Sequence, residues 1–208
     1  MQLNWIAPSV LPMFCLMVIY WDTRWRLGAQ KLKPWLVAGL TLGFVLVVLG
    51  HDTNLLTKAT GLRLPVNQDP LHRVREWSEV ARVAGEARRD LLAEGKPTFI
   101  IASHYGLAGE ISFYLPEAKA TVTKEPLVFC ETSGPASNQF YFWPSYKDRR
   151  GQNAVFLREL DRDRTFDPEV PPELEKEFES VTSLGVRDVL YHGRVVRPLQ
   201  IFACRGLR

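Results

Sequence analysis

The feature that most constrains the fold is a pair of uncharged apolar segments near the start of the chain. No charged residue occurs from Met1 to Trp21, and a second uncharged segment, PWLVAGLTLGFVLVVLG, runs from Pro34 to Gly50. A helix needs about 17 to 25 predominantly apolar residues to cross a bilayer, and each segment reaches the lower end of that range. We therefore predict two transmembrane helices, at about 5–21 and 35–50.

Residues at the ends of these segments favour a membrane location. Trp21 and Trp35 carry amphipathic rings of the kind that is enriched in the headgroup layer. A cleaved signal peptide fits less well, since no basic residue precedes the first segment and no small-residue cleavage motif follows it. A buried helical hairpin in a soluble protein stays open as an alternative, because Pro8 and Pro12 interrupt the first segment.

The loop between the two segments predicts their orientation. Residues 22–33, DTRWRLGAQKLK, hold four basic residues against a single acidic one. Short loops with such an excess of Lys and Arg stay on the cytoplasmic side. We therefore expect residues 1–51 to form two transmembrane helices with a basic cytoplasmic loop, 52–68 to be a connector, and 69–208 to be an extracytoplasmic domain.

The distribution of charge excludes a nucleic-acid-binding surface. The net charge is +3, but residues 1–65 hold six Lys and Arg against two Asp and Glu, whereas residues 66–208 hold twenty against twenty-one. Nucleic-acid binding needs a clustered basic face, which the nearly neutral second part does not offer.

The pattern of residues 69–208 predicts a small α/β domain with one mixed sheet. A helix is expected to begin at Asp69-Pro70, an N-cap followed by proline at the first helical position, and to end before Gly95. Later runs rich in β-branched and aromatic residues predict strands, and apolar residues at helical spacing predict helices. The expected elements are strand 98–102, helix 107–115, strand 127–130, strand 153–157, an acidic helix 173–179, and an antiparallel hairpin of 186–191 with 194–204 that turns at His192-Gly193.

Candidate site residues follow the first two of these strands. His104 and Tyr105 lie where strand 98–102 ends, and Glu110 is in the helix that follows. In open α/β sheets ligands bind at the carboxyl edge of the strands. Asn138, Gln139, Tyr141 and Trp143 form a polar and aromatic run in the loop after strand 127–130, and such side chains suit a sugar or a lipid headgroup. The simpler interpretation is a loop whose aromatic rings close the core.

The motifs of common catalytic sites are absent from the sequence. Ser103 and His104 are not part of a Gly-x-Ser-x-Gly elbow, and Gly106 to Gly109 lack the spacing and the lysine of a phosphate loop. The four histidines share no metal-ligand spacing and no Cys-x-x-Cys pair exists, so we predict neither a catalytic residue nor a metal site in this chain.

Two cysteines fall at predicted strand ends in the outer domain. In an oxidising compartment Cys130 and Cys204 could form a disulfide. Otherwise both are small core residues.

Three segments of the domain resemble a known family. FIIASHYGLAGEISFYLP, NQFYFWP and GQNAVFL together are similar to the C-terminal extracytoplasmic part of bacterial membrane glycosyltransferases of family 39, a group similar to protein mannosyltransferases and the lipid A aminoarabinose transferase. A Tyr-x-Leu-Ala-x-Glu motif of that part is matched from Tyr105 to Glu110. Its Asn-Gln-aromatic-aromatic-x-Trp element is matched from Asn138 to Trp143.

The resemblance implies a function for the whole enzyme rather than for this chain alone. It implies transfer of a sugar from a polyprenyl-phosphate donor to a lipid, glycan or protein acceptor, in the bacterial inner membrane with the C-terminal domain periplasmic. The family's acidic catalytic residues lie in the first extracytoplasmic loop, which this chain lacks, so the chain is expected to be inactive alone and to pair with a missing N-terminal membrane portion.

On the same resemblance, the residues expected to bind substrate are Tyr105, Glu110, Asn138, Gln139 and Trp143, and His104 is added for its position between a strand end and a helix start. No cofactor is implied in this chain, and a divalent cation in the complete enzyme stays open. Two alternatives also stay open. One is a membrane-anchored ligand-binding or scaffold domain without catalysis, and the other is a soluble α/β hydrolase or nucleotide enzyme.

Overall fold

The computed structural model describes residues 7–29, 31–52, 55, 57–58, 61, 65, 69–132, 136, 139–160 and 169–208. The chain divides into two compact units, residues 1–71 and 72–208, and each is described by itself. Most of the connector predicted at 52–68 lies outside the described residues, and so does Asn138.

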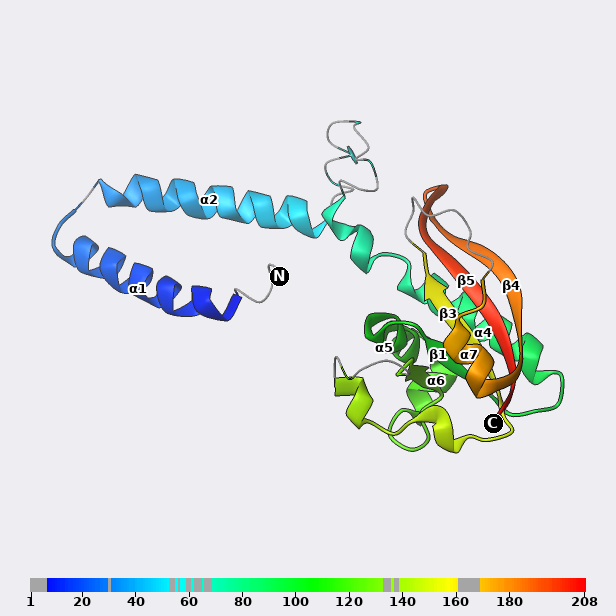
Figure 1. Cartoon of the computed structure of the whole chain (residues 1–208). Coiled ribbons are helices and arrows are strands. Elements are labelled where there is room, and N and C mark those ends of the chain that lie inside the picture. The colour runs from blue at the N-terminus through cyan, green and yellow to red at the C-terminus, as the bar shows by residue number, and fades with distance from the viewer. Residues whose placement is uncertain are drawn as a thin grey trace. The chain divides into compact units, whose positions relative to one another are not determined.

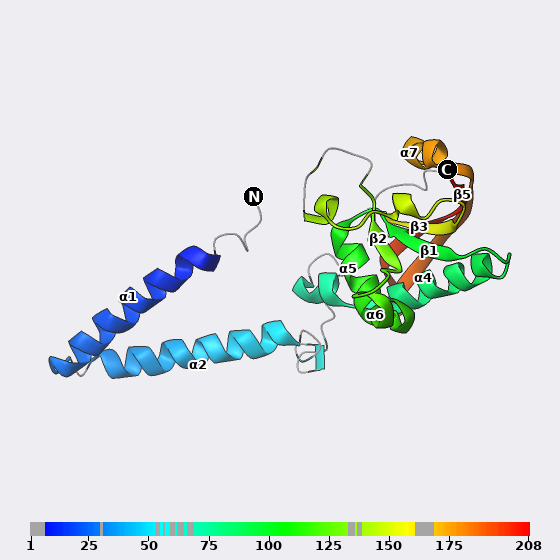
Figure 2. The ribbon, with the colours of Figure 1, turned by 90° about the horizontal axis from the view of Figure 1, so that it is seen from below.

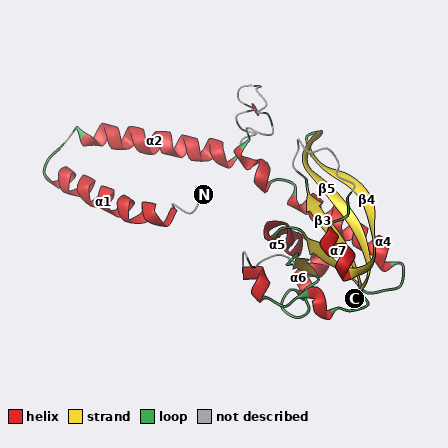
Figure 3. Cartoon of the chain, viewed as in Figure 1, coloured by secondary structure: helices red, strands yellow, loops and turns green. Residues whose placement is uncertain are grey.

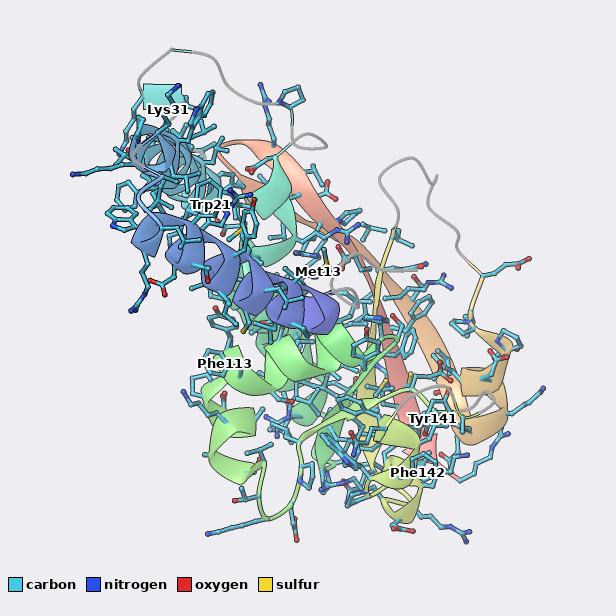
Figure 4. The ribbon with its side chains drawn as sticks, turned by 90° about the vertical axis from the view of Figure 1, so that its left-hand side faces the viewer. Met13, Trp21, Lys31, Phe113, Tyr141 and Phe142 are labelled. Carbon is cyan, nitrogen blue, oxygen red and sulfur yellow. The ribbon has the colours of Figure 1, made fainter. Side chains whose placement is uncertain are left out.

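The first unit is a pair of helices joined by a short turn (Figure 1). α1 runs over Ala7–Arg26 and α2 over Leu32–His51. Met13 on α1 is 70% exposed and, like Trp21, projects from the helix (Figure 4). α2 buries none of its residues. Both helices therefore present apolar side chains that the described part of the chain does not cover.

One described helix, α2, is long and apolar enough to cross a membrane. The prediction of two such helices is wrong on this point. α1 continues through Asp22, Arg24 and Arg26, and these charged side chains dilute its apolar length. Signal sequences and core helices of soluble proteins can share the length and composition of α2, so its membrane location stays a prediction.

The second unit is built on a five-stranded mixed sheet, as the sequence pattern predicts (Figure 3). The strand order is β2-β1-β3-β5-β4, in which β1 pairs in parallel with both β2 and β3, while β5 is antiparallel to β3 and β4. The strands are β1 (Thr98–Ala102), β2 (Val128–Cys130), β3 (Asn153–Glu159), β4 (Phe178–Tyr191) and β5 (Arg194–Leu207).

Helices cover both faces of this sheet (Figure 2). α4 (Trp77–Leu92), α5 (Tyr105–Tyr114) and α6 (Pro116–Thr121) lie on one face, and α7 (Pro172–Glu177) lies on the other. Short 3-10 helices, η3 (Gln139–Phe142) and η4 (Tyr146–Asp148), lie in the connection from β2 to β3. Tyr146 of η4 is fully buried in the aromatic core beside Phe99 and Phe129.

The first helix of this part of the chain begins later than the sequence predicts. Pro70–Val74 form a 3-10 helix, η2, and α4 begins only at Trp77. Asp69 accepts a hydrogen bond from the backbone N–H of Leu71 at 2.9 Å, which satisfies one backbone donor in the first turn of η2. Glu76 then adopts φ 60°, a left-handed conformation that ends one helix before the next begins.

The β4–β5 hairpin confirms the predicted turn at His192-Gly193 but is longer than predicted. Both turn residues have positive φ, 49° and 75°, as a tight two-residue hairpin turn requires. β4 begins at Phe178, where the predicted acidic helix 173–179 was expected to continue. Phe178 is 1% exposed, and its burial in the core favours an extended backbone there over another helical residue.

Candidate functional site

A cavity of about 770 Å³ lies at the β2 edge of the sheet. This volume is within the range of sites for small molecules, about 300 to 1,000 Å³. Its lining comes from α5, α6, the loop before β2, β2 itself and the segment from Phe140 to Tyr146. The lining is predominantly apolar and includes the aromatic residues Phe113, Phe129, Phe140, Trp143 and Tyr146.

Two connections of the sheet form the walls of this cavity. β1 lies between β2 and β3, so the chain leaves β1 toward one side and returns to its other side. The connection from β1 to β2 carries α5 and α6, and the connection from β2 to β3 carries η3 and η4. The reversal of strand order itself lies between β1 and β3, so this cavity, at the outer edge of β2, is separate from the crevice in which open α/β sheets commonly bind ligands.

A row of aromatic rings runs from the end of β1 to this cavity. The rings of His104 and Tyr105 are 4.1 Å apart between centroids, and those of Tyr105 and Phe140 are 6.4 Å apart. Phe140 and Trp143 follow at 4.6 Å. The structure thus brings together the loop after β1 and the loop after β2, which the sequence singles out. Aromatic rings in such a row offer faces on which an apolar ligand face can stack.

Two lysines add positive charge to the apolar cavity. Lys119 and Lys124 both line it, and the Lys119 ammonium lies 4.7 Å from the centre of the Phe113 ring. Phe113 projects from α5 (Figure 4). Neither lysine forms an ion pair with an acidic side chain of the described residues. The cavity therefore combines an apolar wall with cationic groups that are able to receive an anion.

The backbone of β2 adds directional hydrogen-bonding groups. Leu127 O accepts from Ile100 at 2.9 Å, and Glu131 N donates to Ala102 at 2.8 Å, so both residues point their backbone toward β1. Because backbone groups alternate in direction along a strand, those of Val128 and Cys130 point to the open edge, where both residues line the cavity.

Of the other predicted site residues that the structure describes, His104, Tyr105, Glu110 and Gln139 lie outside the cavity lining. His104 is the N-cap of α5, where its Nδ1 accepts a hydrogen bond from the backbone N–H of Gly106 at 3.1 Å. Glu110 is half-buried on α5, and Gln139 is exposed at the start of η3. Tyr141 and Phe142 lie on the same short helix (Figure 4), and Phe142 is 81% exposed.

Sequence reasoning missed Phe113, Lys119 and Lys124. The signal was present in part, because Phe113 belongs to the FYLP segment and the two lysines flank the end of α6. What a single sequence does not show is that these residues turn toward the loop after β2.

The two buried cysteines do not form the disulfide that the sequence allows. Cys130 and Cys204 are free thiols on β2 and β5, which are separated by β1 and β3. Three strand spacings of about 4.8 Å far exceed the roughly 7 Å limit between bridged Cα atoms. Both are small core residues instead. Burial raises the pKa of the Cys204 thiol to about 12, and burial together with the charge of Glu131 raises the pKa of Cys130.

Within the part of the chain that the structure describes, no three His, Cys, Asp or Glu side chains are grouped to hold a metal ion. Comparison of the chain with protein-family models, with curated proteins and with solved structures found no match.

Proposed function

We propose that this chain is the C-terminal part of a membrane glycosyltransferase, and that its α/β domain holds the polyprenyl-phosphate-linked sugar donor. The observation that carries the proposal is the cavity at the β2 edge, in which an aromatic wall adjoins two lysines. A prenyl phosphate has the matching chemistry, since its chain is apolar and its headgroup is anionic.

The surroundings of the cavity fit a sugar next to the phosphate. The aromatic row that ends at Trp143 offers ring faces to the apolar face of a sugar. The outward backbone N–H groups of β2 are donors suited to phosphate or hydroxyl oxygens. The apolar helix α2 supplies an anchor of the length that a bilayer requires.

The proposal gives this domain binding and positioning, not the transfer step. In the family that the chain resembles, the acidic catalytic residues belong to the first extracytoplasmic loop. Transfer is therefore expected only when an N-terminal membrane portion is supplied. The rival hypothesis is a membrane-anchored binding domain without catalysis. In that hypothesis the cavity also binds the ligand, but no sugar is transferred.

Binding of a polyprenyl phosphate to the full chain in nanodiscs tests the first step. We expect Trp143→Ala and Lys119→Ala each to weaken binding roughly tenfold, since each removes a central contact of the cavity. Phe142→Ala and Lys96→Ala are the matched controls, because both residues lie outside the cavity lining. Both variants are expected to bind the polyprenyl phosphate as tightly as the unmodified chain does. Equal binding of polyprenol, which lacks the phosphate, or equal loss in the controls would overturn the proposal.

Transfer assays separate the proposal from its rival. Co-reconstitution with the N-terminal membrane portion of a transferase of the proposed kind is expected to produce sugar transfer that depends on Trp143. Unchanged transfer with Trp143→Ala would limit the domain to a scaffold.

A further inference from the structure

The edge strand β2 presents backbone groups to the cavity that pair with nothing else in the described part of the chain. Val128 and Cys130 direct their N–H and C=O groups away from β1, and both residues line the cavity. They are only 8% and 6% exposed. No hydrogen bond joins these outward groups to another described residue. Buried backbone polar groups need partners, so a ligand that enters the cavity has to supply them.

The outward groups of β2 include acceptors as well as donors. Val128 and Cys130 each offer one N–H and one C=O, and they lie about 7 Å apart along the strand. A phosphate ester provides only acceptors, so it leaves both carbonyls unpaired. A hydroxyl both donates and accepts. An added peptide strand fits less well than a ring with hydroxyls, because β2 has only three residues and strands commonly have five or six.

The cavity has a cationic end and an aromatic end. Lys124 precedes the first residue of β2 by four positions, and Lys119 lies over the ring of Phe113. Phe140, in contrast, contacts the ring of Tyr105, which begins α5 just after the parallel strand β1 ends. Tyr105 and Phe113 are eight helical residues apart, about 12 Å along the axis of α5. The lysines therefore lie where β2 begins, and the aromatic row lies where it ends.

We propose that β2 recognises the sugar of the donor through the sugar's hydroxyl groups, with the phosphate at the lysine end of the cavity and the ring beside Trp143. The inference rests on the proposed function and deepens it, because it assigns an orientation and a chemical requirement to the ligand. Thr132 lines the cavity two residues after Cys130 and adds a hydroxyl at the sugar end. The prenyl chain then leaves the cavity past Phe113.

Two ligands that differ in their hydroxyl groups test the proposal. The glucosyl and the cyclohexyl ester of one polyprenyl phosphate share the charge, the chain and a six-membered ring, but the cyclohexyl ring has no hydroxyls. We expect the full chain in nanodiscs to bind the glucosyl ester at least about tenfold more tightly, since the cyclohexyl ester leaves buried backbone groups unpaired. Equal binding of the two esters would overturn the proposal. Binding of neither ester would overturn the proposed function as well.

A proline at position 128 removes one outward donor of β2 and keeps the pairing with β1. The N–H of Val128 points away from β1, and edge strands tolerate proline at such positions. Val128→Pro is expected to reduce the preference for the glucosyl ester at least about threefold, whereas Val128→Ala keeps the N–H and the preference. Loss of folded protein lowers both affinities alike and leaves their ratio unchanged. An undiminished preference in Val128→Pro would overturn the proposal.

Two threonines near opposite ends of β2 test the orientation of the ligand. Thr132→Val removes a hydroxyl at the proposed sugar end and is expected to lower the preference for the glucosyl ester. Thr123→Val is the matched control beside Lys124 and is expected to leave the preference unchanged. The reverse pattern would overturn the orientation.

Hydrogen exchange of single amides provides a measurement that needs no variant. The amides of Val128 and Cys130 are expected to exchange at least about tenfold more slowly with the glucosyl ester bound than with the cyclohexyl ester bound. The amide of Phe129, which faces β1, is expected to exchange equally with either ester. Equal protection of Val128 and Cys130 by the two esters would overturn the proposal.

Discussion

The guanidinium of Arg197 lies 3.7 Å from the centre of the Trp77 ring. Arg197 is 5% exposed, and it also donates to the carboxylate of Glu159 at 2.7 Å and to the backbone carbonyl of Arg73. One side chain of β5 thus joins the start of α4, the end of β3 and η2. Arginine suits this position because its planar fork makes several hydrogen bonds while its face covers a ring.

Arg197→Lys is expected to lower the free energy of unfolding by about 2 to 3 kcal/mol, because an ammonium does not reproduce the fork and leaves part-buried acceptors unsatisfied around a buried side chain. Urea unfolding of the full chain in detergent micelles, followed by tryptophan fluorescence, measures the change. Arg205→Lys, at a position that is about one-third exposed, is the matched control and is expected to cost less than about 1 kcal/mol. Equal effects at both positions would contradict this account.

Gly206→Ala is expected to destabilise the domain by roughly 2 kcal/mol or more. Gly206 has φ 65°, a backbone conformation that L residues rarely adopt, and a Cβ there would collide with the Glu179 side chain. The same unfolding measurement applies. Gly109→Ala is the control, since Gly109 is helical with open space around its added Cβ, and the change is expected to be neutral or to stabilise by up to about 1 kcal/mol.

Adding Glu179→Ala separates the two causes of strain at Gly206. The second substitution removes the colliding side chain but not the left-handed backbone. We expect the double variant to regain only part of the lost stability. Full recovery would show that the backbone conformation costs nothing.

The thiol of Cys204 is expected to resist alkylation in the folded protein. Burial raises the pKa of Cys204 to about 12, so very little reactive thiolate is present at neutral pH. Mass spectrometry after iodoacetamide treatment, with and without denaturant, is expected to show labelling of Cys204 only after unfolding. A crosslinked peptide that contains both cysteines would contradict the strand order.

Acid is expected to weaken the link between the end of α4 and β5. Arg205 bonds to Glu94 at 2.6 and 2.8 Å and lowers the pKa of that carboxyl. A carboxyl whose pKa is lowered by folding adds stability above its unfolded pKa, about 4.3, and loses that contribution as the pH falls through the folded pKa. The stability difference between the unmodified chain and Glu94→Gln should therefore shrink from pH 7 toward pH 3. A difference that is constant over this range would exclude the ion pair as a contributor.

The sequence predicts the elements of the outer domain better than their ends. β1, β3 and the His192-Gly193 turn follow from alternation and turn chemistry, which are local. The helix expected from Asp69 begins only at Trp77. Glu76 adopts a left-handed conformation, and Arg197 holds the backbone carbonyls of Arg73 and Arg75 through contacts between segments far apart in sequence, which a local pattern does not show. The first apolar segment predicts a membrane-spanning helix by its composition. In the structure this helix also includes Asp22 and the arginines after it, which lowers its mean hydropathy.

The position of the candidate site could be predicted in part. Parallel strands carry Tyr105 and the loop of Phe140 to one edge, and their rings do meet. The cations at that edge could not be predicted, since the path of α6 past β2 brings Lys119 to the cavity. The disulfide hypothesis failed for a related reason. Spacing along the chain says nothing about how many strands separate Cys130 from Cys204.

The placement of β5 between β3 and β4 has a consequence for biosynthesis. β3 cannot gain its second neighbour, and β4 cannot gain any, until residues up to Leu207 have left the ribosome. The apolar surface of β1 and β3 therefore stays incompletely covered while the final third of the outer domain is synthesised. During that interval the nascent chain depends on factors that shield such surfaces from premature association.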